Sequence, residues 1–207
     1  MRELRIYCEG GGDGPKTKVP FKIGMKAFLH PLNDLARSAR IRFDVIVCGG
    51  RQSAYDSFKN GLRQYPNAFN VLLVDAEAPV AATKTPWQHL KARDGWDALA
   101  CSDEQCFLMV QTMEAWFIAD IEALKQFYGK DFNANALPKN HLIETVVKNE
   151  LEPALIKASK QTTAGEYKKI KHGAKLLSLI DSSKVRKASP HCDRLFTTLE
   201  NKLTAAN

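Results

Sequence analysis

The first half of the chain alternates short apolar runs with stretches whose apolar positions have helical spacing. The short runs predict four β-strands, at residues 4–9, 43–48, 69–74 and 105–110. The spaced stretches predict four helices, at residues 19–40, 53–64, 86–91 and 113–128. Because strands that alternate with helices form βαβ units, this order favours an α/β fold with a mainly parallel, Rossmann-like sheet. The runs are apolar throughout, as expected of strands that helices cover on both faces.

The pattern changes after Gly129, where the strand signals stop. Helical spacing predicts three more helices, at residues 142–160, 166–180 and 190–203. Two prolines bear on the helix boundaries: Pro31 allows a bend in the first predicted helix, and Pro153 suits the first turn of a second helix. We therefore expect an α/β core over residues 1–128 and a mostly helical C-terminal extension over residues 129–207 that packs on it.

The composition is that of a globular domain with one sizeable core. Of the 207 residues 44% are hydrophobic and 26% charged, and no apolar run approaches the length of a membrane span. The first residues predict a strand and carry no apolar signal region. The five cysteines form neither a disulfide framework nor the paired spacing of a zinc site, which favours reduced thiols. These features predict a cytoplasmic protein without a membrane segment.

The net charge of +7 is unevenly distributed. Residues 139–207 contain 13 Lys and Arg against 7 Asp and Glu, whereas residues 1–138 contain 17 against 16. A basic C-terminal part beside a nearly neutral body is typical of a face that binds a polyanion such as nucleic acid. Lysine-rich helices that are merely solvated give the same pattern, so the charge alone leaves both interpretations open.

Carboxylates follow the predicted strands at the edge where α/β sheets bind ligands, outside the carboxyl ends of the strands. Glu9 ends the first strand, Asp75 and Glu77 follow the third, and Glu114 comes just after the fourth. If the strand continues through Asp75 and Glu77, their side chains point to the same side. Gathered carboxylates repel one another unless a cation or proton intervenes, and oxygen ligands select Mg²⁺ or Mn²⁺. Such a site can hold a phosphodiester and activate water.

Each carboxylate also has a structural interpretation. Glu9 precedes a glycine run and suits a solvated turn, Asp75 suits a helix cap, and Glu114 suits the first turn of a helix. Taken together, their placement at one edge of one sheet favours the metal site. The glycine run at residues 10–14 lacks the spacing of a phosphate-binding Walker loop and predicts a sharp backbone turn instead.

Lys169 and His172 lie three residues apart on a predicted helix and therefore share a face. The lysine could neutralise a phosphate, and the histidine could transfer a proton or contact a second phosphate. The alternative is a surface lysine and a structural histidine.

Four segments in this order resemble a known bacterial family: YCEGGGD at residues 7–13, LLVDAE at 72–77, MVQTMEAWFIAD at 109–120 and EYKKIKH at 166–172. The chain resembles the domain-of-unknown-function 4276 family, which is Toprim-like and related to the RloB family. The likeness extends over nearly the whole chain.

The resemblance implies a Toprim sheet in which Glu9 is the first-strand glutamate. Asp75 and Glu77 match the pair that is Asp-x-Asp in many Toprim enzymes, with a longer side chain in the second position. The resemblance further places Glu114 in a Glu-x-Trp motif, and Lys169 with His172 in a Tyr-x-Lys-x-x-His motif. It implies Mg²⁺ or Mn²⁺ at Glu9, Asp75, Glu77 and Glu114 and catalytic roles for all six residues.

Relatives often lie beside an AAA- or ABC-type ATPase in loci associated with antiphage defence. The first functional hypothesis is therefore a metal-dependent nuclease that acts on DNA or RNA, as a defence effector working with an ATPase partner. The second is a non-catalytic module that binds nucleic acid or the ATPase. The third is a phosphatase or nucleotide-processing enzyme that uses the same cluster on a small substrate.

Overall fold

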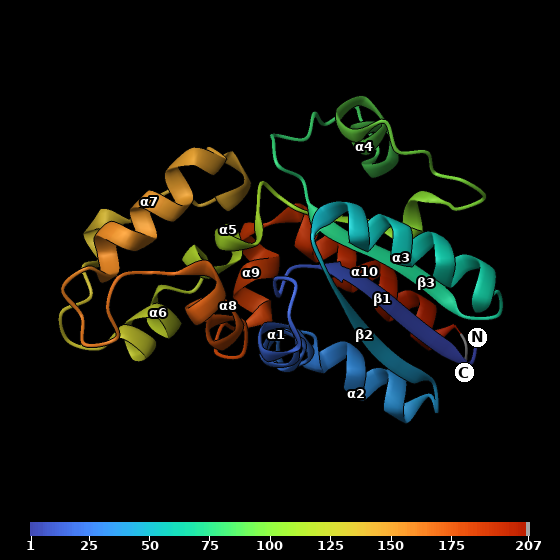
Figure 1. Ribbon diagram of the computed structural model, residues 1–207, viewed down its shortest axis with the longest axis horizontal. Coiled ribbons are helices and arrows are strands. Elements are labelled where there is room, and N and C mark those ends of the chain that lie inside the picture. The colour runs from blue at the N-terminus through green and yellow to red at the C-terminus, as the bar shows by residue number, and fades with distance from the viewer. Residues whose placement is uncertain (206–207) are drawn as a thin grey trace.

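A four-stranded, all-parallel sheet lies at the centre of the computed structural model, which describes residues 1–205 (Figure 1). Its order is β2–β1–β3–β4. The strands are β1 (Glu3–Glu9), β2 (Arg42–Gly49), β3 (Phe69–Asp75) and β4 (Cys106–Met109). All four predicted strands form, which confirms the α/β class, and the parallel order is consistent with a Rossmann-like fold.

Helices cover both faces of the sheet. One face packs against α1 (Pro15–Phe28), α2 (His30–Ser38) and α10 (Pro190–Thr204), and the other against α3 (Arg51–Gln64) and α4 (Pro86–Asp94). Alternate residues along β1 serve the two faces. Leu4, Ile6 and Cys8 belong to the first core, and Tyr7 belongs to the second. The continuous apolar character of the strands thus reflects burial on both sides.

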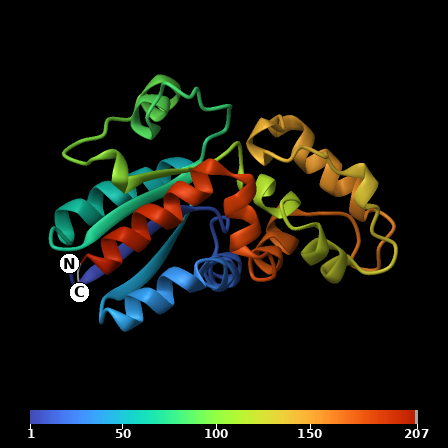
Figure 2. The same ribbon diagram turned by 180° about the vertical axis from the view of Figure 1, so that it is seen from behind.

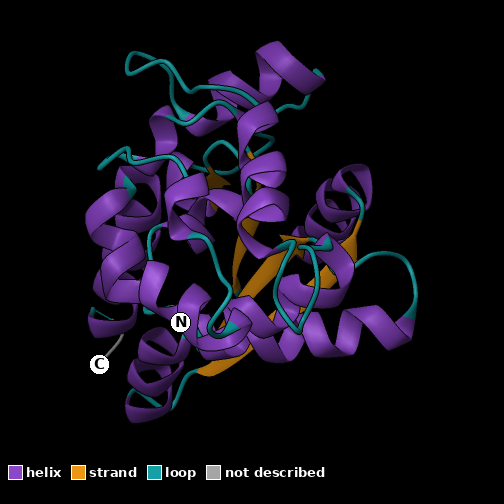
Figure 3. Cartoon of the chain, turned by 90° about the vertical axis from the view of Figure 1, so that its left-hand side faces the viewer, coloured by secondary structure: helices purple, strands orange, loops and turns teal. Residues whose placement is uncertain are grey.

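A lobe of helices lies beyond the carboxyl ends of the strands (Figures 1 and 2). It contains α5 (Met113–Ile118), α6 (Ile121–Tyr128), α7 (Lys148–Ser159), α8 (Lys169–Leu177) and α9 (Ser182–Ala188). Figure 3, viewed from the side of this lobe, shows the strands running behind its helices. The lobe therefore stands at the edge of the sheet where the sequence predicts a ligand site.

Three single turns of 3-10 helix join these elements: η1 (Asp103–Gln105), η2 (Ala134–Ala136) and η3 (Ile143–Thr145). The last helix, α10, returns from the lobe and packs on β4 and α2. It ends close to the start of β1 in both views of the ribbon.

Two predicted helices are each divided in two. The helix predicted at residues 19–40 starts earlier, at Pro15, and breaks at Leu29, so that Pro31 lies in the first turn of α2 rather than at a bend. The helix predicted at residues 113–128 breaks at Asp120, whose carboxylate accepts a hydrogen bond from the Ala123 N–H and caps α6. Apolar spacing continues across both breaks, which explains why the pattern does not reveal them.

Two of the C-terminal helices, α7 and α8, are shorter than predicted, whereas α10 ends one residue beyond its predicted end. Pro153 lies inside α7 and does not open a second helix, and the first part of the predicted segment forms η3 instead. Pro153 is exposed. Its missing N–H removes one hydrogen bond within the helix, and at an exposed position water can bind the carbonyl group that would have accepted it. The sequence pattern missed α9, a short helix with a single fully buried residue, Val185. Among residues 1–205, no helix has both the length and the apolar character needed to cross a lipid bilayer.

Candidate active site

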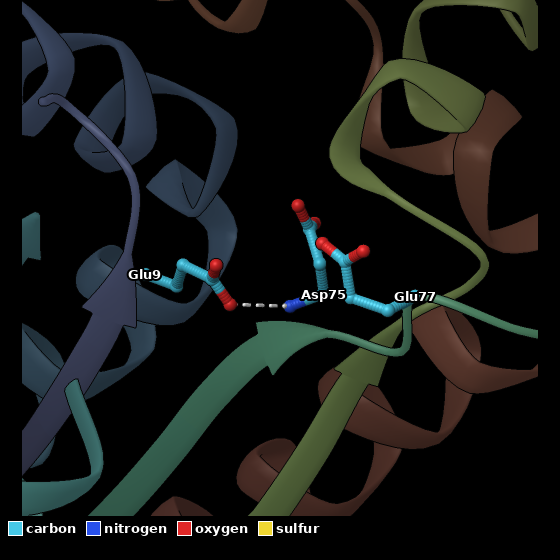
Figure 4. A group of neighbouring side chains, drawn as sticks. All are labelled: Glu9, Asp75 and Glu77. Carbon is cyan, nitrogen blue, oxygen red and sulfur yellow. Dashed lines mark hydrogen bonds between the residues drawn. The ribbon is translucent and has the colours of Figure 1, made fainter. Parts of the chain in front are cut away.

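Three of the predicted carboxylates converge at the carboxyl edge of the sheet. Glu9 ends β1, Asp75 ends the neighbouring strand β3, and Glu77 follows two residues later (Figure 4). One oxygen from each lies within 4.8 Å of the others. The parallel pairing of β1 and β3 explains the meeting of Glu9 and Asp75, because parallel strands end at the same edge.

Glu77 reaches the group by a different route from the one predicted. The strand stops at Asp75, and Glu77 has a left-handed backbone with φ of 66°. Its N–H donates to the Gln111 carbonyl at 2.7 Å. A turn, rather than a continued strand, therefore brings the second acidic side chain beside the first.

Glu9 is held by the strand beside it and by an arginine. Its Oε2 accepts hydrogen bonds from the Asp75 N–H at 3.1 Å, drawn in Figure 4, and from Arg51 Nη1 at 3.3 Å. Burial raises the pKa of Glu9, while the Arg51 guanidinium and the Asp75 N–H favour the charged form. Arg51 is itself fixed by an ion pair with Asp94 at 2.6 Å.

Asp75 is the most buried member of the group. Its Oδ1 accepts a hydrogen bond from the Met113 N–H at the start of α5, at 2.8 Å, and its Oδ2 lies 3.7 Å from Lys169 Nζ. Burial raises the pKa of Asp75 to about 8, and the negative charges of Glu9 and Glu114 add to the rise against the opposing charge of Lys169. With Lys169 beside it Asp75 therefore still keeps its proton near neutral pH, and a further cation at the site would favour its ionised form.

Glu114 joins the group through Lys169 and not directly. It is buried in α5, and its Oε1 accepts a hydrogen bond from the Tyr167 hydroxyl at 3.0 Å and lies 3.2 Å from Lys169 Nζ. Its oxygens are not among the atoms that converge within 4.8 Å. Glu114 thus contacts the lysine that also faces Asp75.

Lys169, the first residue of α8, links two carboxylates. Burial would lower its pKa, but the charges of Asp75 and Glu114 outweigh this effect and raise the pKa above that of an ordinary lysine. The ammonium group is therefore charged at neutral pH. Because its side chain is still 43% exposed, Lys169 can also face a ligand in the adjoining cavity.

His172 lies apart from the other five predicted residues. Its Nδ1 accepts from the Tyr128 hydroxyl, 3.1 Å away, and its ring packs near Phe127, Tyr128 and Tyr167. Burial lowers the pKa of His172, with smaller contributions from neighbouring lysines, so that the ring is neutral at pH 7. The structure places it in the packing of the lobe, one helical turn behind Lys169.

A cavity of about 250 Å³ opens beside the carboxylates. Glu9, Asp75 and Lys169 give it a polar side, whereas Phe21, Met113 and Ile170 give it an apolar one. The glycine loop after β1 closes one end. Gly10 has φ of 127°, and a Cβ there would meet the Phe21 ring at 2.4 Å, so both the turn and the close approach require glycine.

Sequence reasoning missed the cations that pair with the carboxylates. Arg51 begins α3 and bridges Glu9 and Asp94, and Lys148 begins α7 and forms an ion pair with Glu77. The position of Arg51 could have been predicted, because it directly follows the glycine pair at the end of β2 and therefore lies at the same edge of the sheet as Glu9. The position of Lys148 could not have been predicted, since 71 residues separate it from Glu77 and no local pattern links the two.

The arrangement is chemically suited to a hard divalent cation and a phosphate. Carboxylate oxygens are the ligands that Mg²⁺ and Mn²⁺ prefer, and the ends of two adjacent strands hold Glu9 and Asp75 in fixed positions. The cations Arg51, Lys148 and Lys169 offset part of the negative charge. The donor set therefore fits such an ion, although the ion must compete with the charges already present.

Comparison with known proteins yields a match to a family model. It is described as "Domain of unknown function (DUF4276)" and matches residues 23–200. The matched segment includes Asp75, Glu77, Glu114, Lys169 and His172 but not Glu9. The curated proteins and the solved structures contain no significant match. Because the matched segment covers well over half of the chain, the protein belongs to the DUF4276 family.

Proposed function

We propose that this protein is a nuclease that uses Mg²⁺ or Mn²⁺ to hydrolyse phosphodiester bonds of DNA or RNA. The observation that carries the proposal is the convergence of Glu9, Asp75 and Glu77, whose oxygens lie within 4.8 Å of one another. Carboxylates this close together repel one another, and a bound divalent cation would relieve the part of that repulsion that the neighbouring Arg and Lys side chains leave. The resemblance to Toprim enzymes in the same residues adds support.

The proposed roles follow from the contacts. Glu9, Asp75 and Glu77 would hold the divalent ion, which when bound supplies Lewis-acid stabilisation of the phosphate and activation of water. Lys169 stabilises negative charge on the phosphate, and Glu114 positions that lysine from a buried site. His172 has no direct role in this scheme, because it does not line the cavity.

The test uses purified protein with Mn²⁺ or Mg²⁺ and labelled single-stranded DNA, duplex DNA, tRNA and other RNA. Glu9→Gln and Asp75→Asn keep side-chain size and remove a charge, and we expect each to reduce cleavage by about 100-fold or more. Asp56→Asn, on the exposed surface of α3, is the matched control and should retain full activity. Cleavage that is unchanged in both site variants contradicts the assignment.

A second candidate is a non-catalytic module that binds nucleic acid or an ATPase. The observation that favours it is the pairing of the carboxylates with Arg51, Lys148 and Lys169, which offsets charge without a metal. Titration calorimetry with Mn²⁺ separates the two candidates. Wild-type binding that Asp75→Asn abolishes favours the nuclease, whereas no binding at millimolar Mn²⁺ favours the module.

We further propose a cytoplasmic antiphage role as an effector that an AAA- or ABC-type ATPase partner controls. This part rests on the resemblance alone. Co-expression with an AAA- or ABC-type ATPase from the same locus, where the locus encodes one, followed by affinity purification, tests it. A stable complex supports the partnership, and separate elution of the two proteins with and without ATP argues against it.

A further inference from the structure

Two helices with no acidic residue lie side by side next to the candidate active site. α1 and α8 pack along each other, as Figures 1 and 2 show from opposite sides. The close approach occurs at Gly24, where a Cβ would meet the Ala174 carbonyl oxygen at 2.2 Å. α1 contains Lys16, Lys18, Lys22 and Lys26, and α8 contains Lys169, Lys171 and Lys175. Neither helix contains Asp or Glu.

Each helix turns a stripe of lysines and apolar side chains to solvent. The α1 stripe has helical spacing and is exposed along its length, with Lys16, Val19, Ile23 and Lys26. Val19 and Ile23 are 58% and 63% exposed and, being four residues apart, lie next to each other on the helix surface.

The α8 stripe consists of exposed lysines that continue from its N-cap: Lys168, Lys171 and Lys175. Beside them Ile170 is 55% exposed. No ion pair involves these three lysines within residues 1–205, and the same holds for Lys16.

The few carboxylates near this pair of helices leave its charge largely unbalanced. Asp44 on β2 pairs with Lys22 at 2.9 Å, and Asp13 and Glu166 are exposed just before α1 and α8. The excess positive charge also acts on the buried ring of His172. Burial lowers the pKa of this histidine, and the charges of Lys171, Lys175 and Lys168 lower it further. The exposed lysines of these two neighbouring helices thus carry a positive charge that few nearby carboxylates offset.

The same face leads into the candidate active site. The first residue of α8, Lys169, contacts Asp75 and Glu114, and the next, Ile170, lines the cavity. Thr17 and Phe21 of α1 line the same cavity. A chain of phosphates along the outer stripes would therefore arrive at the carboxylates without leaving the basic surface.

We propose that the exposed face of α1 and α8 is the binding surface for a polynucleotide, with lysines on the phosphates and Val19, Ile23 and Ile170 against sugars and bases. The role of this surface in delivering a substrate rests on the proposed nuclease function, whereas its exposed lysines and apolar side chains do not. It locates the affinity for nucleic acid on one helix pair, instead of on the basic C-terminal part as a whole. Regularly spaced cations with apolar side chains between them match the alternation of charged and apolar groups in a single strand.

The experiment measures binding apart from cleavage. Fluorescence anisotropy with labelled single-stranded and duplex oligonucleotides is recorded in EDTA over a range of salt concentrations. The test variant Lys16→Gln/Lys171→Gln/Lys175→Gln removes three charges from the face. The control variant Lys130→Gln/Lys139→Gln/Lys157→Gln removes three from exposed positions around α7. All six substitutions are at exposed sites, so both variants should fold, which circular dichroism checks.

We expect the test variant to bind at least about tenfold more weakly than wild type. On duplex DNA, the negative slope of log affinity against log salt should become shallower by about 2 to 3. The control should stay within about twofold of wild type. Binding in EDTA requires neither the metal ion nor cleavage, so a failed nuclease assignment remains distinct from a failed binding surface. Equal losses in test and control variants, or no loss in either, overturn the inference. Binding to anionic lipid vesicles without binding to oligonucleotides overturns it in favour of a membrane surface.

Discussion

Asp75 is the residue whose charge state should respond most to its surroundings. Burial raises its pKa from an ordinary value of 3.8 to about 8, so the folded state binds more protons than the unfolded state between these pH values. Its contribution to stability is therefore fully present below pH 3.8 and is lost as pH rises to about 8. In a chelating buffer, we expect the free energy of unfolding to fall across this window more steeply in wild type than in Asp75→Asn.

Urea denaturation at pH 5.5, 7 and 8.5 measures this difference, and comparison with Asp75→Asn cancels the titration of other groups. The variant should gain stability relative to wild type as pH rises. Parallel pH profiles for the two proteins would show that Asp75 ionises normally in the fold.

The meeting of Glu9 and Asp75 could be predicted from the sequence because both residues stand at visible strand ends. Strand ends are visible as the points where apolar runs stop, and carboxylates at those points meet when the strands are parallel. The partners of the carboxylates do not follow such a rule. Lys148 approaches Glu77 only because of the path of the loops between them, and no local pattern encodes that path.

At the scale of elements, the crossing of α1 and α8 depends on one glycine. A methyl group on Gly24 would overlap the Ala174 carbonyl, and backbone atoms cannot move aside as a flexible side chain does. We expect Gly24→Ala to destabilise the protein by about 1 to 3 kcal/mol, despite the better helix propensity of alanine. Thermal denaturation followed by circular dichroism provides the measurement.

Gly14→Ala is the control for this prediction. Gly14 precedes α1 with an ordinary φ of −100° and has open space around its Cβ position, so a loss well under that of Gly24→Ala is expected. Equal stability of the two variants would mean that the helices separate without cost. Weaker binding of nucleic acid by Gly24→Ala would also be expected, because the basic face is formed across this crossing.

The sequence revealed strands better than helix ends. A buried strand is bounded by glycine and polar residues, and all four were found within a few positions. Helix breaks such as those at Leu29 and Asp120 leave the apolar spacing intact on both sides. The periodic pattern therefore continues past residues at which the helix stops. Their position depends on tertiary packing and on capping contacts.

At the scale of the whole molecule, aromatic rings join the helices on one face of the sheet to the lobe. Phe28 of α1 stacks on Trp116 of α5, with ring centroids 4.7 Å apart. It also meets Phe196 of α10 edge to face, with ring centroids 5.7 Å apart. Side chains from β1, β3 and the C-terminal helices share this one core. The core and the C-terminal extension should therefore unfold together, in a single transition.

Phe196→Ala tests this coupling from the C-terminal end. Phe196 is fully buried, so the loss of its ring should cost about 3 to 5 kcal/mol, whereas Asn201→Ala on the exposed side of α10 should change stability by less than about 0.5 kcal/mol. Urea unfolding curves from tryptophan fluorescence and far-ultraviolet circular dichroism should coincide and shift by the same amount. If Phe196→Ala instead splits the curves into two transitions, the sheet is stable without α10. α8 and the carboxylates of the sheet would then belong to units that fold separately, and the lysines of α8 would not be held rigidly beside the carboxylates.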